Sequence, residues 1–343
     1  MGNNPSSGRG ISRFLSGRFG RKLIQYALVL FIALTINFAL PRLAPGDPLM
    51  YFMGQEVNTL TPEQRDRMNR ELGLEGSVWE QYGDFMKGAV SLQLGSSTKY
   101  GKPVTEVLRE RIPWTLLLVV PAFAISPLLG IIGGAYAAWN RGKRRDVLLL
   151  AGVLALESTP GFWVGMLLIA VFAVRLGWLP SYGAVPLVHS DDFSYYIEMV
   201  RHLILPVSTI TIVTVGTSFL LTRSSMLDTL GQDYIYMAEA KGVSRRTLIY
   251  RHALRNALLP VYTHVTMSLG VLLSGAVVVE TVFSYPGLGR LLYESVVARD
   301  YPMMQGVFLM ITIGVIAANL LADLTYPLVD PRARSRKQVK EAV

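Results

Sequence analysis

The chain has 343 residues, of which 51% are hydrophobic and 17% are charged, and its formal net charge at pH 7 is +9. This balance fits a protein that crosses a membrane several times better than it fits a soluble domain. Cysteine is absent, which excludes disulfide bonds and thiolate metal sites.

Six apolar segments are long enough to cross a bilayer, which takes roughly 20 residues of helix. They are residues 23–40, 114–138, 147–174, 203–221, 257–279 and 306–324. The third is interrupted in its middle by the stretch from Glu157 to Pro160, and the fifth contains Pro260 near its start. The sequence therefore predicts an all-α polytopic membrane protein with six transmembrane helices.

The first apolar segment, residues 23–40, follows a basic tail, residues 1–22. It is too long for the apolar part of a secretory signal, and no small-residue cleavage site follows it. We therefore expect a retained first transmembrane helix behind a short N-terminal tail.

Short basic clusters alternate with the predicted spans and indicate the orientation of the chain. They lie in residues 9–22, 141–145, 223–256 and 332–340. Because Lys and Arg accumulate in short cytoplasmic segments, we expect both termini, including the tail 329–343, to be cytoplasmic. The positive net charge then reflects topology and anionic lipid head groups, and no nucleic acid is expected as a partner.

Residues 41–113 form a long external segment with two predicted helices. The first begins at Pro62, with Thr61 as its cap. The second runs from Trp79 to about Val90 and has an aromatic face. This face consists of Trp79, Tyr82, Phe85 and Met86. The sequence thus predicts a small extracytoplasmic helical insertion ahead of a five-helix core, residues 114–328.

A polar, basic segment, residues 223–256, separates two long apolar runs of the core. It is typical of a short amphipathic helix on the cytoplasmic face. Ala238 and Gly242 are four residues apart, so we expect them to share one smooth face for a partner. Ser244 is the expected cap of a second helix.

Recognisable catalytic chemistry is missing from the sequence. It contains no Gly-x-x-x-x-Gly-Lys-Ser/Thr loop for nucleotide phosphates and no His-Glu-x-x-His metal motif. We therefore expect no enzyme, no catalytic residues, no metal site and no cofactor bound by this chain.

Two groups of residues are candidates for contact with other molecules. Glu157 is an acid inside a span, at a depth of roughly 15 Å, where it would suit a peptide amino group or a metal cation. It would line a pathway with Pro160 and Phe162, although a structural acid bonded to its neighbours is an open alternative. Glu280 is expected to anchor the loop 284–289, which either contacts an external protein or is a plain connection.

Several long motifs resemble one protein family. They include Gly-Gln-Asp-Tyr-Ile-Tyr-Met-Ala-Glu-Ala-Lys-Gly-Val-Ser at 231–244, Arg-Leu-Ala-Pro-Gly-Asp-Pro at 42–48 and Glu-Thr-Val-Phe-Ser-Tyr-Pro-Gly-Leu-Gly-Arg-Leu at 280–291. In this order they resemble ABC importer permeases of the dipeptide/oligopeptide/nickel family, from about Leu23 to Arg334. The general importer motif has Glu-Ala where this chain has Tyr236 and Met237, which argues against sugar and phosphate importers.

The resemblance implies a type I ABC importer permease fold and a multi-pass protein of the cell inner membrane. The partners would be a second homologous permease in a heterodimer, two cytoplasmic ATPases that use ATP and Mg, an extracytoplasmic solute-binding protein and membrane lipid. It implies ATPase-coupling residues in the segment 223–256 and binding-protein contacts in the last external loop. The coupling residues are Asp233, Tyr234, Ala238, Lys241, Gly242 and Val243, and the loop contacts are Tyr285, Pro286 and Gly287.

The function implied is ATP-driven, binding-protein-dependent uptake of dipeptides or oligopeptides. Uptake of nickel or another small solute by the same family is an alternative. From a different class, a secondary transporter or channel stays open, although it would need broken helices in both halves.

Overall fold

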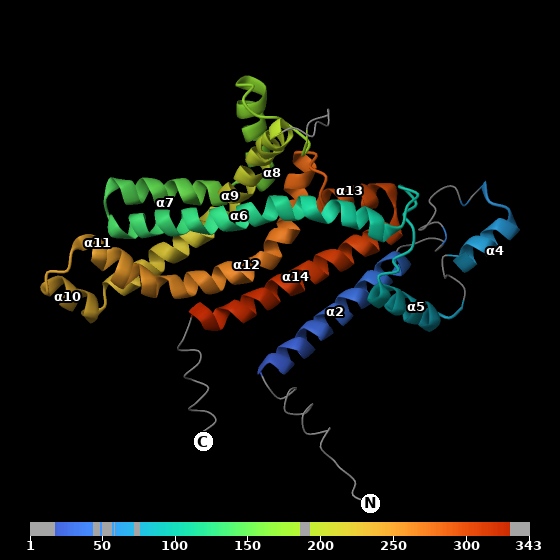
Figure 1. Ribbon diagram of the computed structural model, residues 1–343, viewed down its shortest axis with the longest axis horizontal. Helices are drawn as coiled ribbons and strands as arrows, with labels where there is room; N and C mark the ends of the chain where they lie inside the picture. Colours follow the sequence, from blue (N-terminus) through green and yellow to red (C-terminus); the bar gives the residue numbers. More distant parts are fainter. Residues whose placement is uncertain are drawn as a thin grey trace, which may run out of the picture. The chain divides into compact units, whose positions relative to one another are not determined.

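The computed structural model describes residues 18–43, 49, 57, 59–71, 76–185 and 193–329. This part of the chain is helical apart from turns and one isolated bridge between Ser96 and Pro103 (Figure 1). In chain order the helices are α2 (Arg18–Leu43), α4 (Pro62–Glu71), α5 (Val78–Ser91), α6 (Val104–Trp139), α7 (Arg144–Glu157), α8 (Gly161–Leu168), η2 (Ile169–Arg175), α9 (Phe193–Leu230), α10 (Asp233–Ala240), α11 (Arg245–Thr247), η3 (Leu248–Ala253), α12 (Leu254–Val282), α13 (Leu288–Ala298) and α14 (Tyr301–Val329). The predicted all-α class is confirmed for the described residues.

Four helices in the described chain are long and apolar enough to cross a membrane: most of α2, all of α6, all of α9 and most of α14. Helix α7 and the helix α8–η2 are separated by a bend of 103°. If this bent pair counts as one span, it is the fifth. The predicted interruption of the third span is therefore confirmed, whereas the count of six spans stays a prediction.

Two helix starts differ from the expected ones. Helix α6 begins at Val104 and α9 at Phe193, each about ten residues before the apolar segment that predicted it. Polar first turns lengthen both helices, and hydropathy alone does not detect such turns. Residues 104–113, assigned to the external insertion, are therefore the beginning of α6.

The chain divides into two compact units, of which the first comprises residues 1–108 and 294–316. In this unit α5 packs on α2: Tyr82 lies edge-on to Phe38 at 5.2 Å between ring centroids, and its hydroxyl is 2.8 Å from the Thr35 hydroxyl. Phe85 also contacts Phe38, at 5.5 Å. Tyr82 and Phe85 of the predicted aromatic face thus pack on α2, whereas Trp79, at the start of α5, is 82% exposed.

The turn between α13 and α14 also belongs to the first unit and is fixed by Asp300. Its carboxylate accepts hydrogen bonds from the Ser97 hydroxyl and from the backbone N–H groups of Lys99 and Met303. Beside it the Tyr100 hydroxyl donates to Glu294 at 2.7 Å. Burial, followed by this hydrogen bond, raises the pKa of Tyr100. The segment after the loop 284–289, which the sequence analysis left without a helix, is thus largely helical, because α13 occupies Leu288–Ala298.

The second unit, residues 109–293 and 317–343, holds α6 to α12. Two glycines let α6 approach α9 closely. A Cβ atom at Gly130 would lie 2.6 Å from the Ser218 Cβ, and one at Gly134 would lie 2.5 Å from the Phe219 carbonyl oxygen. Small residues four apart allow close backbone contact between membrane helices. The α6–α9 pair therefore forms a tightly packed frame for the polar segments at its ends.

Candidate functional site

The basic segment between α9 and α12 folds as two short helices with a turn between them. Helix α10 buries Ile235, which is 2% exposed, in a cluster with Met226, Leu248 and Ala257. Its other side is open, with Tyr236 58% and Met237 60% exposed. The Ser244 hydroxyl accepts the backbone N–H of Thr247 at 3.4 Å, so the expected cap is confirmed.

Gly242 ends α10 through its backbone. The N–H of Val243 donates to the Ala238 carbonyl at 3.2 Å, and the N–H of Gly242 donates to the Glu239 carbonyl at 2.9 Å. This pair of bonds is the Schellman arrangement, which places the residue after the cap in the left-handed region. Gly242 accordingly has φ +76°, a value that favours glycine.

The shared face expected of Ala238 and Gly242 does not form. The side chain of Ala238 is partly buried against the Ile235 cluster, whereas Gly242 lies beyond the helix, with nothing within 4 Å of an added Cβ. Helix α10 ends at Ala240, so helical spacing no longer relates the two positions. Of the predicted coupling residues, the structure exposes Asp233, Tyr234, Lys241 and Gly242.

An open groove runs beside α10, with a volume of about 280 Å³. The Asn256 amide donates to the Tyr234 hydroxyl at 2.8 Å across this groove, which ties α10 to α12. Its lining consists of Asp228, Thr229, Gln232, Tyr234, Asn256 and Leu259. The exposed side of α10 is therefore a surface that contacts with α12 hold in place, and it is available to a partner. Sequence reasoning missed Asn256.

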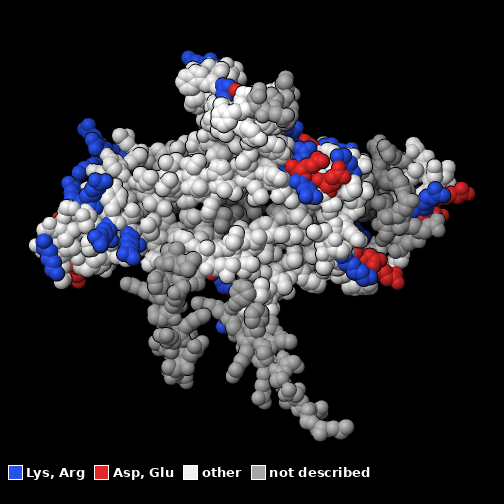
Figure 2. All heavy atoms as spheres, in the orientation of Figure 1, with Lys and Arg blue, Asp and Glu red and all other residues white. Residues whose placement is uncertain are grey.

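Basic side chains gather over α10, α11 and the turn between α6 and α7 (Figure 2). Two contacts fix this region. The Arg245 guanidinium lies over the Trp139 ring at 4.5 Å, and Arg223 holds Asp146 at 2.7 Å. The sequence shows all four residues but carries no signal of their pairing, because the partners are 77 and more than 100 residues apart.

The break in the third span carries Glu157. It is the last residue of α7, roughly 20 Å along the helix axis from the helix start at 1.5 Å per residue. The Thr217 hydroxyl donates to its carboxylate at 2.9 Å, and a Cβ at Gly216 would lie 3.1 Å from its Cδ. Glu157 and Thr217 are both exposed on this chain.

The other two predicted pathway residues lie next to this break. Pro160 is the N-terminal cap position of α8, and Phe162 is 46% exposed. The structure thus places the three predicted residues at one corner between α7 and α8. Their contact with a substrate stays a prediction.

Glu280 is fully buried near the end of α12 and anchors the following loop as expected. Its carboxylate accepts hydrogen bonds from the Thr115 hydroxyl at 2.8 Å and from the backbone N–H of Arg290 at 3.0 Å. The same Thr115 oxygen accepts the N–H of Leu288 at 2.7 Å. One carboxylate therefore joins α6, α12 and α13, and a sequence pattern could not identify Thr115 as the partner.

The three residues predicted to contact a binding protein differ in how far they are exposed. Tyr285 has no exposed surface, its ring packs edge-on to Trp114 at 6.1 Å, and Gly287 is also buried. Burial, and then the nearby Glu280 carboxylate, raises the pKa of Tyr285. In this conformation Tyr285 and Gly287 offer no surface to a docked protein, so only the partly exposed Pro286 keeps the predicted role.

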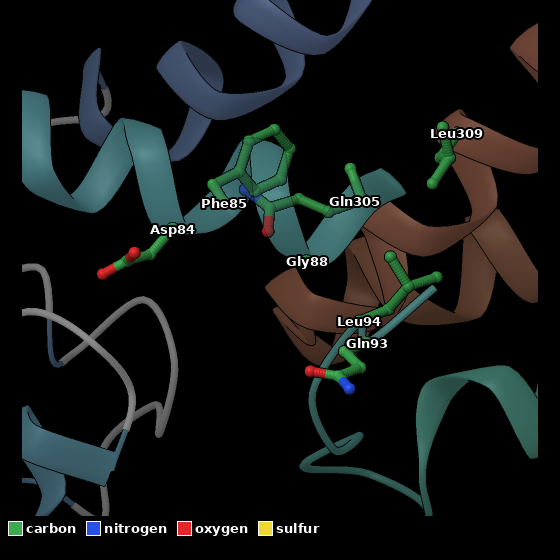
Figure 3. Close-up of a pocket in the computed structure, with 8 residues that line it drawn as sticks. Asp84, Phe85, Gly88, Gln93, Leu94, Gln305 and Leu309 are labelled. Carbon is green, nitrogen blue, oxygen red and sulfur yellow. The ribbon is translucent and has the colours of Figure 1, made fainter. Parts of the chain in front are cut away.

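The first unit contains a small cavity of about 80 Å³ (Figure 3). It is lined by the residues Asp84, Phe85, Gly88, Ala89, Gln93, Leu94, Gln305 and Leu309. Sites for drug-sized ligands measure roughly 300–1,000 Å³, so this cavity is too small for even a short peptide. Within the described ranges, no group of three His, Cys, Asp or Glu side chains is placed to hold a metal.

Comparison with protein families identifies the chain. Residues 130–335 match the family described as "Binding-protein-dependent transport system inner membrane component". Residues 12–119 match the N-terminal part of such a membrane component. The chain belongs to this family. It is therefore a multi-pass membrane subunit of a transporter and no enzyme, and the channel and secondary-transporter alternatives are set aside.

Relatives of this permease are similar over most of its length. The dipeptide transport system permease protein DppB of Escherichia coli (strain K12) is 38% identical over 326 residues, covering 90% of this chain and 96% of its own. A putative peptide transport system permease of Brucella abortus (strain 2308) is 37% identical, covering 92% and 98%. The di/tripeptide permease DppB of Pseudomonas aeruginosa is 35% identical, covering 88% and 94%.

Solved structures confirm the fold of the permease. A chain of the MetNI methionine ABC transporter, in an inward-facing conformation, superposes with a TM-score of 0.54 at 16% identity. The match covers 65% of this chain and 96% of that chain. The structure is therefore an all-α ABC importer permease fold, whereas the six spans, the type I class and the external insertion stay predictions.

Proposed function

We propose that this permease carries short peptides into the cell as half of the pathway of an ATP-driven importer. The similarity to permeases named for dipeptides and di/tripeptides, over about nine-tenths of the chain, is the observation that supports this substrate. The exposed acid at the break of the third span also fits a substrate that carries an ammonium group.

The partner subunits follow from the same proposal. A second, homologous permease completes the pathway, two cytoplasmic ATPases supply ATP and Mg²⁺ chemistry, and an extracytoplasmic protein delivers the peptide. The chain spans the inner membrane six times, as a type I permease, with both termini and the segment 223–256 in the cytoplasm. The basic residues over α10 and α11 support this orientation (Figure 2).

Coupling in this proposal acts through α10. The exposed residues Asp233 and Tyr234 of α10, and Lys241 directly after it, contact the ATPase, while Ile235 fixes the helix to the permease. The Schellman turn at Gly242 joins α10 to α11 and holds Val243 in place, so the segment moves as one body. Closure of the ATPases then swings the spans between inward-open and outward-open states.

Substrate passage in this proposal uses the corner between α7 and α8. The Glu157 carboxylate accepts a hydrogen bond from the ammonium group of the peptide, and the Thr217 hydroxyl orients that carboxylate. Pro160 and Phe162 border the path. The outer loop at Pro286 contacts the binding protein, and the Glu280 carboxylate holds that loop in shape.

Uptake by proteoliposomes tests the function. The complex of this chain with its neighbouring permease, ATPases and binding protein is reconstituted, and radiolabelled dipeptide is supplied outside. We expect uptake that requires both ATP and the binding protein. Uptake of Ni²⁺ but no dipeptide under these conditions would contradict the substrate. Transport by this chain alone, without ATPases, would contradict the mechanism.

A further inference from the structure

The turn between α6 and α7 carries unneutralised positive charge. Lys143 and Arg144 are exposed and make no ion pair with another described residue, and Arg141 is exposed beside them. Arg145 donates to the Tyr136 hydroxyl at 3.0 Å. The blue surface at this end of α6 and α7 is visible in Figure 2.

The nearest acid does not cancel this charge. Asp146 is 2% exposed, and both of its carboxylate oxygens are occupied by Arg223, at 2.7 and 2.8 Å. One of them also accepts the backbone N–H of Gly142 at 3.0 Å. The carboxylate therefore points into the protein, and Lys143 and Arg144 keep their charge for a ligand.

An exposed apolar strip continues from these cations along α7. Val147 is 57% exposed and Leu148 is 71% exposed. Residues four apart share a helix face, so Leu148 follows Arg144. Lys143 is the residue before the helix, and its carbonyl accepts a hydrogen bond from the Val147 N–H at 3.2 Å. One turn further, Gly152 has nothing within 4 Å of an added Cβ, so the strip is open there.

We infer that this surface binds an anionic phospholipid. Its phosphate pairs with Lys143 and Arg144, and an acyl chain lies along Val147, Leu148 and Gly152. The positive charge favours an anionic group. Because the apolar strip begins next to the cations, the surface favours a lipid over free phosphate. The inference requires membrane insertion but not peptide transport.

Native mass spectrometry of the purified complex in a neutral detergent tests the inference directly. Phosphatidylglycerol and phosphatidylcholine with identical acyl chains are titrated separately. We expect tighter binding of phosphatidylglycerol. The double variant Lys143→Gln/Arg144→Gln should weaken phosphatidylglycerol binding by about tenfold or more and leave phosphatidylcholine unchanged.

Two further variants separate this site from general effects of charge. Arg246→Gln/Arg251→Gln removes two exposed cations from α11 and η3, outside the cation–apolar strip of α7, and should weaken phosphatidylglycerol binding less than Lys143→Gln/Arg144→Gln does. Leu148→Ser should weaken both phospholipids and leave binding of glycerol 3-phosphate unchanged.

Three results would overturn the inference. Equal loss of phosphatidylglycerol binding in both double variants would reveal a net-charge effect. Full competition by glycerol 3-phosphate, with no effect of Leu148→Ser, would reveal a soluble-phosphate site. Loss of ATPase co-purification in Lys143→Gln/Arg144→Gln with normal lipid binding would make the surface a protein interface. Peptide uptake is measured separately, so its failure leaves the lipid result interpretable.

Discussion

Arg223 of α9 holds Asp146 of α7 through two hydrogen bonds, from Nε to Oδ1 at 2.7 Å and from Nη2 to Oδ2 at 2.8 Å. The side chains are 20% and 3% exposed, so this pair is shielded on the acid side. Bidentate pairing of this kind fixes orientation as well as charge. The contact thereby sets how the basic turn before α7 lies against the frame formed by α6 and α9.

Breaking this pair should destabilise the protein. Asp146→Asn leaves the Arg223 guanidinium without its counter-charge in a partly buried place, and we expect a loss of roughly 2 kcal/mol or more. The check is the thermal unfolding midpoint of the purified chain in detergent, with Arg223→Gln and the double variant completing a cycle. Additive losses in that cycle would mean that the two side chains do not stabilise each other.

Substitution of Gly242 separates backbone conformation from contact with the ATPase. An L-residue in the left-handed region costs roughly 1–2 kcal/mol, and asparagine tolerates that region better than most. Gly242→Val should therefore distort the turn and lower the uptake per ATP hydrolysed, while Gly242→Asn keeps the turn. The measurement is dipeptide uptake and ATP hydrolysis on the same proteoliposomes, at equal permease abundance.

The two possible results with Gly242→Asn differ in meaning. Normal coupling would assign Gly242 a purely conformational role. Uncoupling as severe as with Gly242→Val would show that the ATPase requires a bare backbone there, since this chain itself leaves space for a side chain. Normal uptake by Gly242→Trp would remove the glycine from the mechanism altogether.

Neutralising Glu157 should impair transport more than folding. A charge-assisted hydrogen bond to an ammonium group contributes about 1.5–3 kcal/mol, so Glu157→Gln should lower dipeptide uptake about tenfold or more. Thr217→Val, which only removes the hydroxyl donor, should have a smaller effect. Wild-type uptake by Glu157→Gln would exclude contact with substrate. A fall in membrane abundance to match the fall in uptake would instead identify Glu157 as a structural acid.

Removing the buried carboxylate of Glu280 should destabilise the outer loop. Glu280→Ala leaves the Thr115 hydroxyl and the Arg290 N–H without their acceptor, at about 1–3 kcal/mol for each unsatisfied group. Glu198→Gln is a matched control, because Glu198 forms an exposed pair with Arg201 and should contribute less than about 1 kcal/mol. Equal unfolding midpoints for the two variants would contradict the anchoring role.

Local signals predicted much of the secondary structure. Thr61 and Ser244 marked helix starts because a cap acts within a few residues of its own position. The Glu157–Pro160 stretch indicated the broken span for the same reason. Helix α13 was missed because the Pro286–Gly287 pair indicates a turn and hides the helix that begins directly after it.

Partners distant in sequence could not be predicted. Thr115 is 165 residues from Glu280, and nothing in either segment encodes their meeting. Tyr285 was expected to contact a binding protein because the family resemblance implies such contacts in this loop, yet the turn folds inward around Glu280 and buries the ring. Ala238 and Gly242 were paired by helical spacing, which fails once the chain leaves α10.

Helix α6 has one consequence that extends across the membrane. Thr115 bonds Glu280 near one end of this helix, and Trp139 at the other end lies under Arg245, a separation of about 36 Å along the axis at 1.5 Å per residue. Between these two contacts, Pro121 and Pro127 each remove one backbone hydrogen bond from the helix, so bending concentrates at these prolines. Because one continuous helix carries both contacts, we expect a tilt of the segment 223–256 to be transmitted through α6 to the Glu280 anchor.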